Sequence, residues 1–483
     1  MNGPIRRVAV GIFVCLFALL AGVTWYQVVR ADELRDDPRN PRPALAESGK
    51  QRGLIVAVDG TVLAKSVVDP QDPRSYVRQY PEGEAFAHLV GYSSFLIGNS
   101  ALEDAYASEL RSRRDLTISD LVAAILGQDL RPQSIEVTAD PELQRAALAA
   151  LGANRGAVVA LDPRTGAVLA QVSSPSFDPN LLLGDDANEQ WNLLLQTEGE
   201  PTRDRGTLEI YAPGSTFKTV VSAAALDTGA ATPGTTFDDP VEFDLPGSDA
   251  TIANANGEAC NDGVSTTMLQ AFVRSCNTIF ADLSIQMGAV DIGITAEAMG
   301  FNQEIAYEWS IPEAVWDTAT LASDAAALGQ SGIGERDVRA TPLHMAMVAA
   351  AVANDGVATT PFAVRRIFDA DGTTVEETEV TQLGQAMTLE TAMTLTQMME
   401  RVVTEGTGRN AAVPGVRVAG KTGTATGADG FSNPWFIGFA PVDDPTIAIA
   451  VFIEGSAASG ESASGGSVAA PIASQLIELW LSS

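Results

Sequence analysis

The chain has 483 residues, more than one hydrophobic core normally organises, because cores stop growing near roughly 250 to 300 residues. Its 46 % hydrophobic and 19 % charged residues are typical of folded protein, so two folded domains are expected. The 61 acidic residues outnumber the 30 basic ones, and the formal net charge is −31. Such an acidic surface repels phosphate backbones, and no basic stripe offsets it, so we exclude nucleic-acid binding.

An apolar segment begins at Val8 and ends at Tyr26. As a helix it is long enough to cross the roughly 30 Å hydrocarbon layer of a bilayer. Its last two residues, Trp25 and Tyr26, are aromatic, as at many membrane interfaces. We predict a transmembrane helix over 8–28 and a cytoplasmic tail over 1–7.

The charges that flank this segment predict its orientation. Arg6 and Arg7 precede it, and four acidic residues follow, namely Asp32, Glu33, Asp36 and Asp37. The positive-inside rule then puts the N-terminus in the cytoplasm and the rest of the chain outside the cell membrane. A cleaved signal peptide is the alternative, but no small-x-small site follows, and Cys15 lacks the small residue that lipoprotein processing needs before it.

The two cysteines beyond the predicted membrane segment are Cys260 and Cys276. An extracytoplasmic location is oxidising, so we expect them to form a disulfide. The alternative is two buried free thiols, which behave as small hydrophobic groups.

A small α+β module is predicted over 30–152. Proline, aspartate and arginine are frequent up to about residue 80, which is typical of an extended stalk. The elements expected next are a strand pair over Gly53–Ala64 with an Asp59-Gly60 turn, helices within Glu103–Gln128, and a helix from Asp140 to Leu151.

A second domain is predicted over 153–483. It begins with a hairpin whose turn is Asp162-Pro163-Arg164-Thr165-Gly166, and helical spacing then dominates until about residue 410. Strands are expected again over 416–425, 435–440 and 446–454, before a helix over 468–481. Strands at both ends of one domain indicate an antiparallel sheet assembled from both ends.

Ser215 and Lys218 stand at the start of an apolar helix that Gly229 can end. Residues three apart share a helix face, so the lysine amine can reach the serine hydroxyl. A lysine activates a serine only when it is neutral, and burial together with a second cation such as Lys421 would promote that state. Ser-x-x-Lys is a weak motif by itself, but after Lys65 the chain has only these two lysines.

Two further motifs follow in the chain. Ser275-Cys276-Asn277 is by itself more typical of a turn or a helix cap. Lys421-Thr422-Gly423-Thr424 falls in a threonine-rich strand, where glycine would let a substrate backbone approach and lysine could meet a carboxylate. The plain alternative is a β-bulge with an exposed lysine.

The order Ser-x-x-Lys, Ser-x-Asn, Lys-Thr-Gly is the motif set of β-lactamases and penicillin-binding proteins. The chain resembles class B penicillin-binding proteins over nearly its whole length, most of all the penicillin-binding protein A type of actinobacteria. Further matching phrases are Arg52-Gly53, Leu102-Glu103, the 162–166 turn, Ser176-Phe177-Asp178-Pro179-Asn180, Thr341-Pro342-Leu343 and Trp435-Phe436-Ile437-Gly438.

The resemblance implies an α+β transpeptidase domain, like that of serine β-lactamases, with an antiparallel sheet, flanking helices and a helical subdomain. It also implies a D,D-transpeptidase that cross-links peptidoglycan stem peptides and is acylated by β-lactams. Ser215 would attack the penultimate D-Ala, and an amine of a neighbouring stem would take the acyl group. Neither a cofactor nor a metal is implied, and His88 and His344 are the only histidines.

The family roles transfer to matching positions of this chain. Those implied to be catalytic are Ser215 as nucleophile, Lys218 as general base, Ser275 as proton relay, Asn277 as orienting residue and Lys421 as source of positive potential. Thr422, Gly423 and Thr424 would bind the substrate and its terminal carboxylate, and the backbone N–H groups of Ser215 and Thr424 would bind the oxyanion.

Rival functions share these motifs. A D,D-carboxypeptidase differs only in using water as acceptor, and a β-lactamase normally lacks the anchor and the N-terminal module. A non-catalytic division scaffold would not need the intact motifs. The module over 30–152 is too short for a glycosyltransferase, so we expect a partner glycan polymerase in the membrane, together with division or elongation proteins.

Overall fold

The computed structural model describes residues 2–30, 34, 49–111, 131–427, 430–455 and 463–483. Its contacts divide the chain into two units, Met1–Gln51 with Val68–Val77, and Arg52–Val67 with Arg78–Ser483. The helical spacing predicted around Leu121 to Leu126 lies outside the described residues.

The first unit contains a long apolar helix, α1 (Asn2–Thr24), which continues as one π-helical turn, Trp25–Val29. The 27 residues Gly3–Val29 have a mean hydropathy of 2.4 in their most apolar window. At 1.5 Å per residue they extend about 40 Å, which is enough to cross a bilayer. The helix begins earlier than the predicted segment.

The N-terminal part of the second unit is organised around a six-stranded sheet in the order β15-β14-β6-β1-β2-β3. Its N-terminal strands are β1 (Ile55–Val56), β2 (Val62–Val68), β3 (Tyr76–Gln79) and β6 (Ser134–Val137). The predicted Asp59-Gly60 turn joins β1 to β2: Gly60 has φ +87°, and Asp59 Oδ1 accepts from Thr61 N at 2.8 Å. We call this sheet the pedestal sheet.

Small elements surround the pedestal sheet. They are a 3₁₀ turn (Gly83–Phe86), α4 (Ala87–Val90), β4 (Ser93–Ser94), β5 (Gly98–Asn99), α5 (Ala101–Ala105) and α6 (Ala107–Leu110). Helix α8 (Pro141–Leu151) then begins where the sequence predicts, because Asp140 caps it by accepting from Leu143 N at 2.8 Å.

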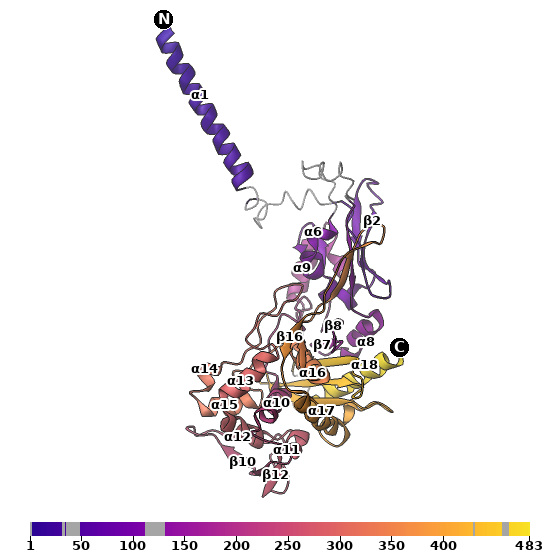
Figure 1. The fold of residues 1–483 in the computed structure, drawn as a ribbon. Coiled ribbons are helices and arrows are strands. Elements are labelled where there is room, and N and C mark those ends of the chain that lie inside the picture. The colour runs from indigo at the N-terminus through magenta and orange to yellow at the C-terminus, as the bar shows by residue number, and fades with distance from the viewer. Residues whose placement is uncertain (1, 31–33, 35–48, 112–130, 428–429, 456–462) are drawn as a thin grey trace. The chain divides into compact units, whose positions relative to one another are not determined.

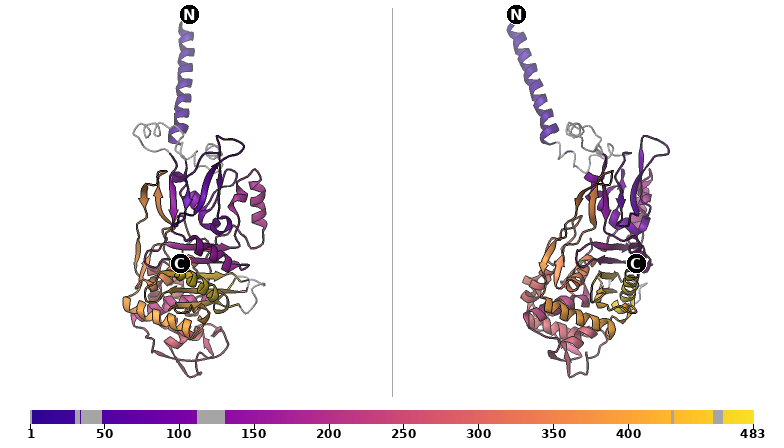
Figure 2. Two further views of the ribbon diagram at one scale, coloured as in Figure 1. Left: turned by 90° about the vertical axis from the view of Figure 1, so that its right-hand side faces the viewer. Right: turned by 45° about the vertical axis from the view of Figure 1, so that its right-hand side comes forward.

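Two strands of the pedestal sheet come from much later in the chain. They are β14 (Val364–Phe368) and β15 (Thr374–Glu377), and β14 pairs with β6. Figure 2 shows these orange strands beside the purple ones. Glu136 of β6 holds Arg365 and Arg366 of β14 at 3.0 and 2.6 Å. Strands from both sides of the predicted boundary at residue 153 therefore share one sheet.

A five-stranded antiparallel sheet in the order β17-β18-β19-β7-β8 organises the rest. Its strands are β7 (Gly156–Leu161), β8 (Val168–Ser174), β17 (Ala419–Thr426), β18 (Ser432–Ala440) and β19 (Ile447–Ile453). Because β7 pairs with β19, the two ends of this region meet in one sheet, as predicted (Figure 1).

Helices cover both faces of this sheet. On one face α8 and α18 (Ala470–Ser482) pack with Val158 and Ala160 of β7 in one hydrophobic cluster. On the other face α16 (Pro342–Ala353) packs against the sheet, and Val159 belongs to the larger cluster there. Alternate residues of β7 thus face different layers, and the strand is buried throughout.

The middle of the chain forms a helical subdomain, with short antiparallel strand pairs that the sequence did not predict. Its helices are α10 (Lys218–Thr228), α11 (Met268–Arg274), α12 (Asn277–Met287), α13 (Ala289–Ala298), α14 (Thr318–Leu321), α15 (Ala325–Gly332) and α17 (Leu389–Thr404). Helix α9 (Ala187–Gln196) lies apart from these helices, on the side of α6 (Figure 1), and its Trp191 packs on Tyr92. The antiparallel pairs are β9 (Thr236–Asp238) with β12 (Ser265–Thr267), β10 (Glu242–Asp244) with β11 (Thr251–Ala253), and β13 (Val357–Thr359) with β16 (Gln382–Gln385).

Candidate active site

Ser215 lies in a single 3₁₀ turn, Gly214–Phe217, that runs directly into α10. Gly214 has φ +54°, and a Cβ there would lie 2.9 Å from the carbonyl carbon of Thr424 on β17. Only glycine permits this approach, which brings the serine turn against the edge strand of the sheet. Helix α10 ends at Gly229 in the left-handed conformation, as predicted.

Lys218 is completely buried beneath the turn. Its Nζ donates to the carbonyl oxygen of Ser275 and to Oδ1 of Asn277, both at 2.8 Å, and lies 5.5 Å from the ring centre of Phe280. Burial, and next the charge of Lys421, hold the pKa of Lys218 well below its usual range. Among the described residues it forms no ion pair, so a neutral amine is favoured.

Within the described part of the chain, Ser215 Oγ and Lys218 Nζ are not hydrogen bonded to each other. The two side chains still lie on adjacent positions of one helical turn, the spacing that the sequence predicts. Catalytic hydrogen bonds often form fully only when substrate is bound.

Ser275 and Asn277 come from the junction of two helices. Helix α11 ends at Arg274, its C-cap Ser275 has a left-handed φ of +63°, and α12 begins at Asn277. This sharp bend points Asn277 at Lys218 while Asn254 Oδ1 accepts from the backbone N–H of Asn277 at 2.7 Å. Asn254 carries no motif that would have identified it from sequence.

Lys421 is also completely buried, on β17. Its Nζ donates to Ser275 Oγ at 2.8 Å and to the carbonyl oxygen of Thr422 at 2.9 Å, and lies 5.6 Å from the ring centre of Phe272. Burial lowers the pKa of Lys421 to about 7. The lysine is therefore not the exposed residue of a simple β-bulge.

Gly423 makes room for the protein's own backbone. A Cβ at this position would lie 2.9 Å from the carbonyl oxygen of Pro213 and 3.1 Å from the backbone nitrogen of Thr216. The neighbour that requires glycine here is thus the serine turn, whereas the sequence suggested a substrate backbone. Thr424, the next residue, is exposed toward the cavity described below.

A cavity of about 720 Å³ brings the predicted residues together. Its lining includes Ser215, Ser275, Asn277 and the segment 422–424. Residues that the sequence did not single out also line it, among them Thr407, Ser464 and Glu335. Thr407 Oγ1 and Thr422 Oγ1 lie 2.5 Å apart, and Thr424 Oγ1 accepts from Gly465 N at 3.2 Å. Hydroxyl groups thus dominate the side of the cavity next to β17.

A disulfide joins Cys260 to Cys276 at the opposite rim of the cavity. Asp239 accepts from Cys260 N and Asn261 N, both at 2.7 Å, and Arg274 Nη1 donates to the carbonyl oxygen of Cys260 at 2.6 Å. The residue between Ser275 and Asn277 is thus covalently tied to a loop that is itself anchored.

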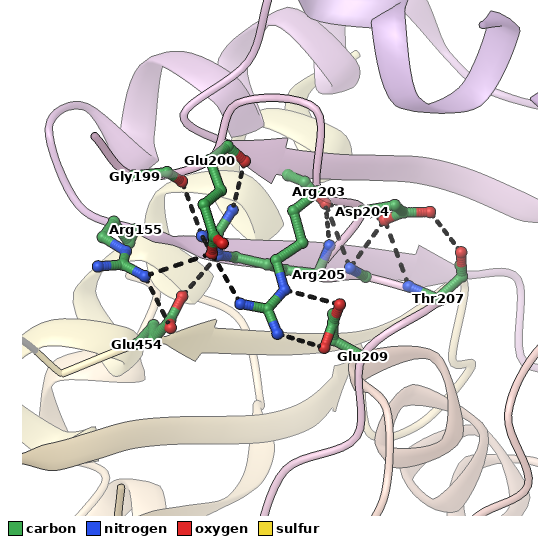
Figure 3. A network of polar contacts seen from close by, with 11 residues as sticks. Arg155, Gly199, Glu200, Arg203, Asp204, Arg205, Thr207, Glu209 and Glu454 are labelled. Atoms are coloured by element: carbon green, nitrogen blue, oxygen red, sulfur yellow. Dashed lines mark hydrogen bonds and ion pairs between the residues drawn. The ribbon is translucent and has the colours of Figure 1, made fainter. Parts of the chain in front are cut away.

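An ionic network supports the loop that leads to the serine turn (Figure 3). Arg205 is completely buried, and its Nε and Nη2 donate to Glu454 Oε2 at 2.6 Å and to the carbonyl oxygen of Gly199 at 2.8 Å. Arg155 Nη2 donates to the other oxygen of Glu454 at 2.9 Å. Asp204 accepts from Gly206 N at 2.9 Å. The network joins the start of β7, the end of β19 and this loop.

Comparisons with known proteins agree with this geometry. Residues 156–478 match the family model described as penicillin binding protein transpeptidase domain, and residues 52–135 match penicillin binding protein A dimerisation domain. The chain is 40 % identical to peptidoglycan D,D-transpeptidase PbpA of Mycolicibacterium smegmatis over 98 % of this chain and 97 % of the relative. It is 38 % identical to PbpA of Mycobacterium tuberculosis over 99 % of both chains.

Solved structures give the same answer. Penicillin-binding protein A from M. tuberculosis, as an imipenem acyl-enzyme complex, superposes with a TM-score of 0.82 at 36 % identity, covering 90 % of this chain and 100 % of that one. The penicillin G acyl-enzyme complex of the same protein gives a TM-score of 0.81, covering 89 % and 100 %. The fold, the motif geometry and the near-complete coverage lead to one conclusion: the chain belongs to the penicillin-binding protein transpeptidase family.

Proposed function

We propose that this chain is a peptidoglycan D,D-transpeptidase that forms an acyl-enzyme on Ser215. The observation that carries the proposal is the arrangement of Ser215, a buried and unpaired Lys218, and the Lys421 strand around one cavity. The activity named for the mycobacterial relatives supports it.

The acylation step uses groups that already lie at the cavity. Ser215 Oγ attacks the carbonyl carbon of the penultimate D-Ala, and neutral Lys218 takes the hydroxyl proton. The backbone N–H groups of Ser215 and Thr424 would hold the oxyanion, and one such donor is worth roughly 3 kcal/mol of barrier. The C–N bond then breaks, and the proton that Lys218 took passes by way of Ser275 to the departing D-Ala amine, which leaves Lys218 neutral again.

The second half reverses these roles. An amine of a neighbouring stem peptide attacks the ester carbonyl, gives its proton to Lys218 and displaces Ser215 Oγ. Asn277 Oδ1 keeps the lysine amine in place, which its 2.8 Å contact with Nζ supports. In the first half, the hydroxyls of Thr422 and Thr424 would bind the terminal carboxylate of the donor, and Lys421 would supply positive potential.

Covalent labelling tests the nucleophile. Ser215→Ala should abolish labelling by a fluorescent penicillin, whereas Ser248→Ala, at an exposed serine outside the cavity lining, should label like the wild type. Persistent labelling of Ser215→Ala would put the nucleophile elsewhere. Release of bound penicillin over many minutes is expected, and rapid release would favour a β-lactamase.

Product analysis separates the two acceptors. A transpeptidase joins a stem peptide to an added amine, while a D,D-carboxypeptidase only releases D-Ala to water. We expect cross-linked product in mass spectra of reactions that contain donor and acceptor peptides. Hydrolysis alone under all acceptor concentrations would favour the carboxypeptidase.

We further propose that α1 anchors the protein in the cell membrane, with the N-terminus cytoplasmic and the remainder outside. In this proposal residues 1–7 are the tail, 8–28 the membrane span, 30–152 the pedestal domain and 153–483 the transpeptidase domain. The apolar helix and Arg6 and Arg7 before it support this orientation. Protease added outside spheroplasts should digest the catalytic domain, and full protection would contradict the topology.

A partner glycan polymerase is part of the same proposal, because residues 52–135 in the N-terminal module match a dimerisation model. Chemical cross-linking in membranes should join the protein to a polymerase that makes glycan strands. Complexes that contain only copies of this chain would argue against such a partner.

A further inference from the structure

Glu335 is a cavity residue for which the steps above have no use. It follows Gly334, whose carbonyl oxygen accepts from Gly214 N at 2.9 Å. Glu335 is thus the next residue after a backbone hydrogen bond that holds the serine turn. Its Oε1 accepts from the backbone N–H of Thr426 at 3.1 Å. The carboxylate therefore lies at the end of β17, two residues beyond Thr424 and on the same cavity as Ser215.

In the part of the chain that the structure describes, the carboxylate of Glu335 forms no ion pair. Within the described residues its Oε2 makes no hydrogen bond, and no arginine, lysine or histidine nitrogen lies within 4.0 Å of either oxygen. Partial burial raises its pKa, which the Thr426 N–H and the charges of Arg339 and Lys218 only partly offset. A cation brought by a ligand would restore the stability of the ionised form.

The other two acidic residues of the cavity differ from Glu335. Glu405 is exposed and forms an ion pair with Arg401 on its own helix. Glu258 is exposed on the disulfide-tied loop, where Asn256 Nδ2 donates to its Oε2 at 3.3 Å. Glu335 is half-buried, lines the same cavity as Ser215 and is held by a backbone contact. Among these three it is the one placed to bind a charged group of the substrate.

We propose that Glu335 is an ammonium-binding subsite that holds a cationic amine of a stem peptide beside the acyl-serine. The inference rests on the proposed transpeptidase function, because that reaction brings an amine to this cavity. An amine carries a positive charge at neutral pH until it is deprotonated for attack. An ion pair with a partly desolvated carboxylate is stronger than one in water and would favour amines over water.

Two stem peptides can supply the ammonium group. The acceptor brings the amine that attacks the ester, and a donor with a side-chain amine could bring one along β17. The chemistry recognised is the same, so the experiment must separate the sources. A purely structural role, in which Glu335 only holds Thr426, must be separated as well.

Glu335→Gln is the informative variant. Glutamine keeps an oxygen that can accept from Thr426 N, so the backbone contact survives, while the negative charge is lost. Glu258→Gln is the matched control, because it removes an exposed charge from the same cavity. Penicillin acylation and the melting temperature should match the wild type in both variants.

The test uses the full-length protein, two synthetic donors that end in D-Ala-D-Ala, and an acceptor peptide with one free amine. One donor has a free side-chain amine and the other has that amine acetylated. If the subsite serves the acceptor, Glu335→Gln lowers the ratio of transfer to hydrolysis by about tenfold with the acetylated donor. If it serves the donor, kcat/KM for D-Ala release falls by about tenfold with the free-amine donor and stays unchanged with the acetylated one.

Two outcomes would overturn the inference. In the first, Glu335→Gln leaves the transfer ratio and the preference for the free-amine donor as in the wild type. In the second, it lowers penicillin acylation and the use of both donors equally, which is the result of a structural role.

Should the glutamine variant not fold, Glu335→Asp keeps the charge and must keep the selectivity. Wild-type protein that acylates with penicillin but never transfers to an amine would contradict the proposed function instead.

Discussion

Two regions of this molecule bury basic side chains, one without a carboxylate partner and the other with one. At the cavity, Lys218 and Lys421 are completely buried, and their amines contact only hydroxyl, amide and carbonyl oxygens within the described structure. In the network of Figure 3, the equally buried Arg205 contacts Glu454 at 2.6 Å. Burial without a counter-charge lowers a pKa, while a carboxylate partner keeps the charge.

The pedestal sheet repeats the paired arrangement. Glu103 is completely buried between Arg52, at 2.7 Å, and Arg78, at 2.6 Å. Burial alone would raise the pKa of Glu103, but the charges and hydrogen bonds of the two arginines lower it. The paired groups therefore keep their charges within the fold, whereas the two unpaired lysines are the residues for which we propose catalytic roles. This contrast predicts which substitutions remove activity and which remove stability.

The largest effect is expected for Lys218→Met, which removes the amine but keeps the buried volume. Loss of a general base should slow penicillin acylation by roughly 10²- to 10⁴-fold. The free energy of unfolding should change by only about 1 kcal/mol, because an unpaired buried amine contributes little to stability. Stopped-flow acylation and urea unfolding measure the two quantities, and a variant that unfolds easily but still acylates would contradict the contrast.

Arg205→Met should show the opposite pattern. Removing one partner of a buried pair leaves Glu454 with less compensation and should cost about 3 to 5 kcal/mol of unfolding free energy. Acylation by the molecules that remain folded should stay near the wild-type rate. Arg336→Met is the control, because its pair with Asp324 is exposed and worth about 1 kcal/mol or less. Equal losses for both variants would remove the distinction between buried and exposed pairs.

The disulfide belongs to the cavity and not to the ion-paired network, so its removal tests the cavity region of the comparison. Cys260 and Cys276 are 16 residues apart, and a loop of that length corresponds to about 3 kcal/mol of stabilisation in the chain-entropy model. The double variant Cys260→Ser with Cys276→Ser should lose about that much stability. It should also acylate a few-fold more slowly, because Asn277 and Lys218 are less firmly held. Acylation rates with and without reductant test the second point, and identical rates would limit the bridge to the fold.

The pH dependence of the wild-type protein tests the two lysines without any substitution. Protonation of Lys218 removes the base, so acylation should fall about tenfold per pH unit below its lowered pKa. Lys421 loses its charge as the pH rises through about 7, so attraction for the substrate carboxylate should weaken above that value. A bell-shaped profile of kcat/KM is expected, and Lys421→Met should lack its alkaline side. A flat profile from pH 5 to 9 would contradict both assignments.

Much of the fold could be predicted because its signals are local. The hairpin of β7 and β8 has a strong turn sequence, and α8 has an aspartate cap. The strands β14 and β15 were not predicted, because nothing within their few residues indicates that β14 pairs with β6 more than 200 residues earlier and that β15 pairs with β14. Long-range pairing of short strands depends on tertiary contacts that periodicity does not record.

The site residues also fall into those that a local motif predicts and those that only the tertiary structure reveals. Ser215, Lys218, Ser275, Asn277 and the Lys421 strand belong to three motifs, and the structure brings all of them to one cavity or directly beneath it. Asn254, Thr407 and Glu335 have no motif of their own, since each acts through its place in the tertiary structure. For Gly423 the sequence suggested the close approach of a substrate backbone. In the structure the close backbone neighbour is the chain itself.

The union of β7 with β19 also has a consequence for biosynthesis. Arg155 beside the first strand and Glu454 beside the last are bonded although 299 residues separate them. At about 5 to 20 residues per second, a ribosome needs on the order of 15 to 60 s to make that interval. During this time β7 and β8 lack their neighbour, and the serine turn lacks β17. The nascent chain therefore cannot react with peptidoglycan or antibiotic before its C-terminal strands have been synthesised.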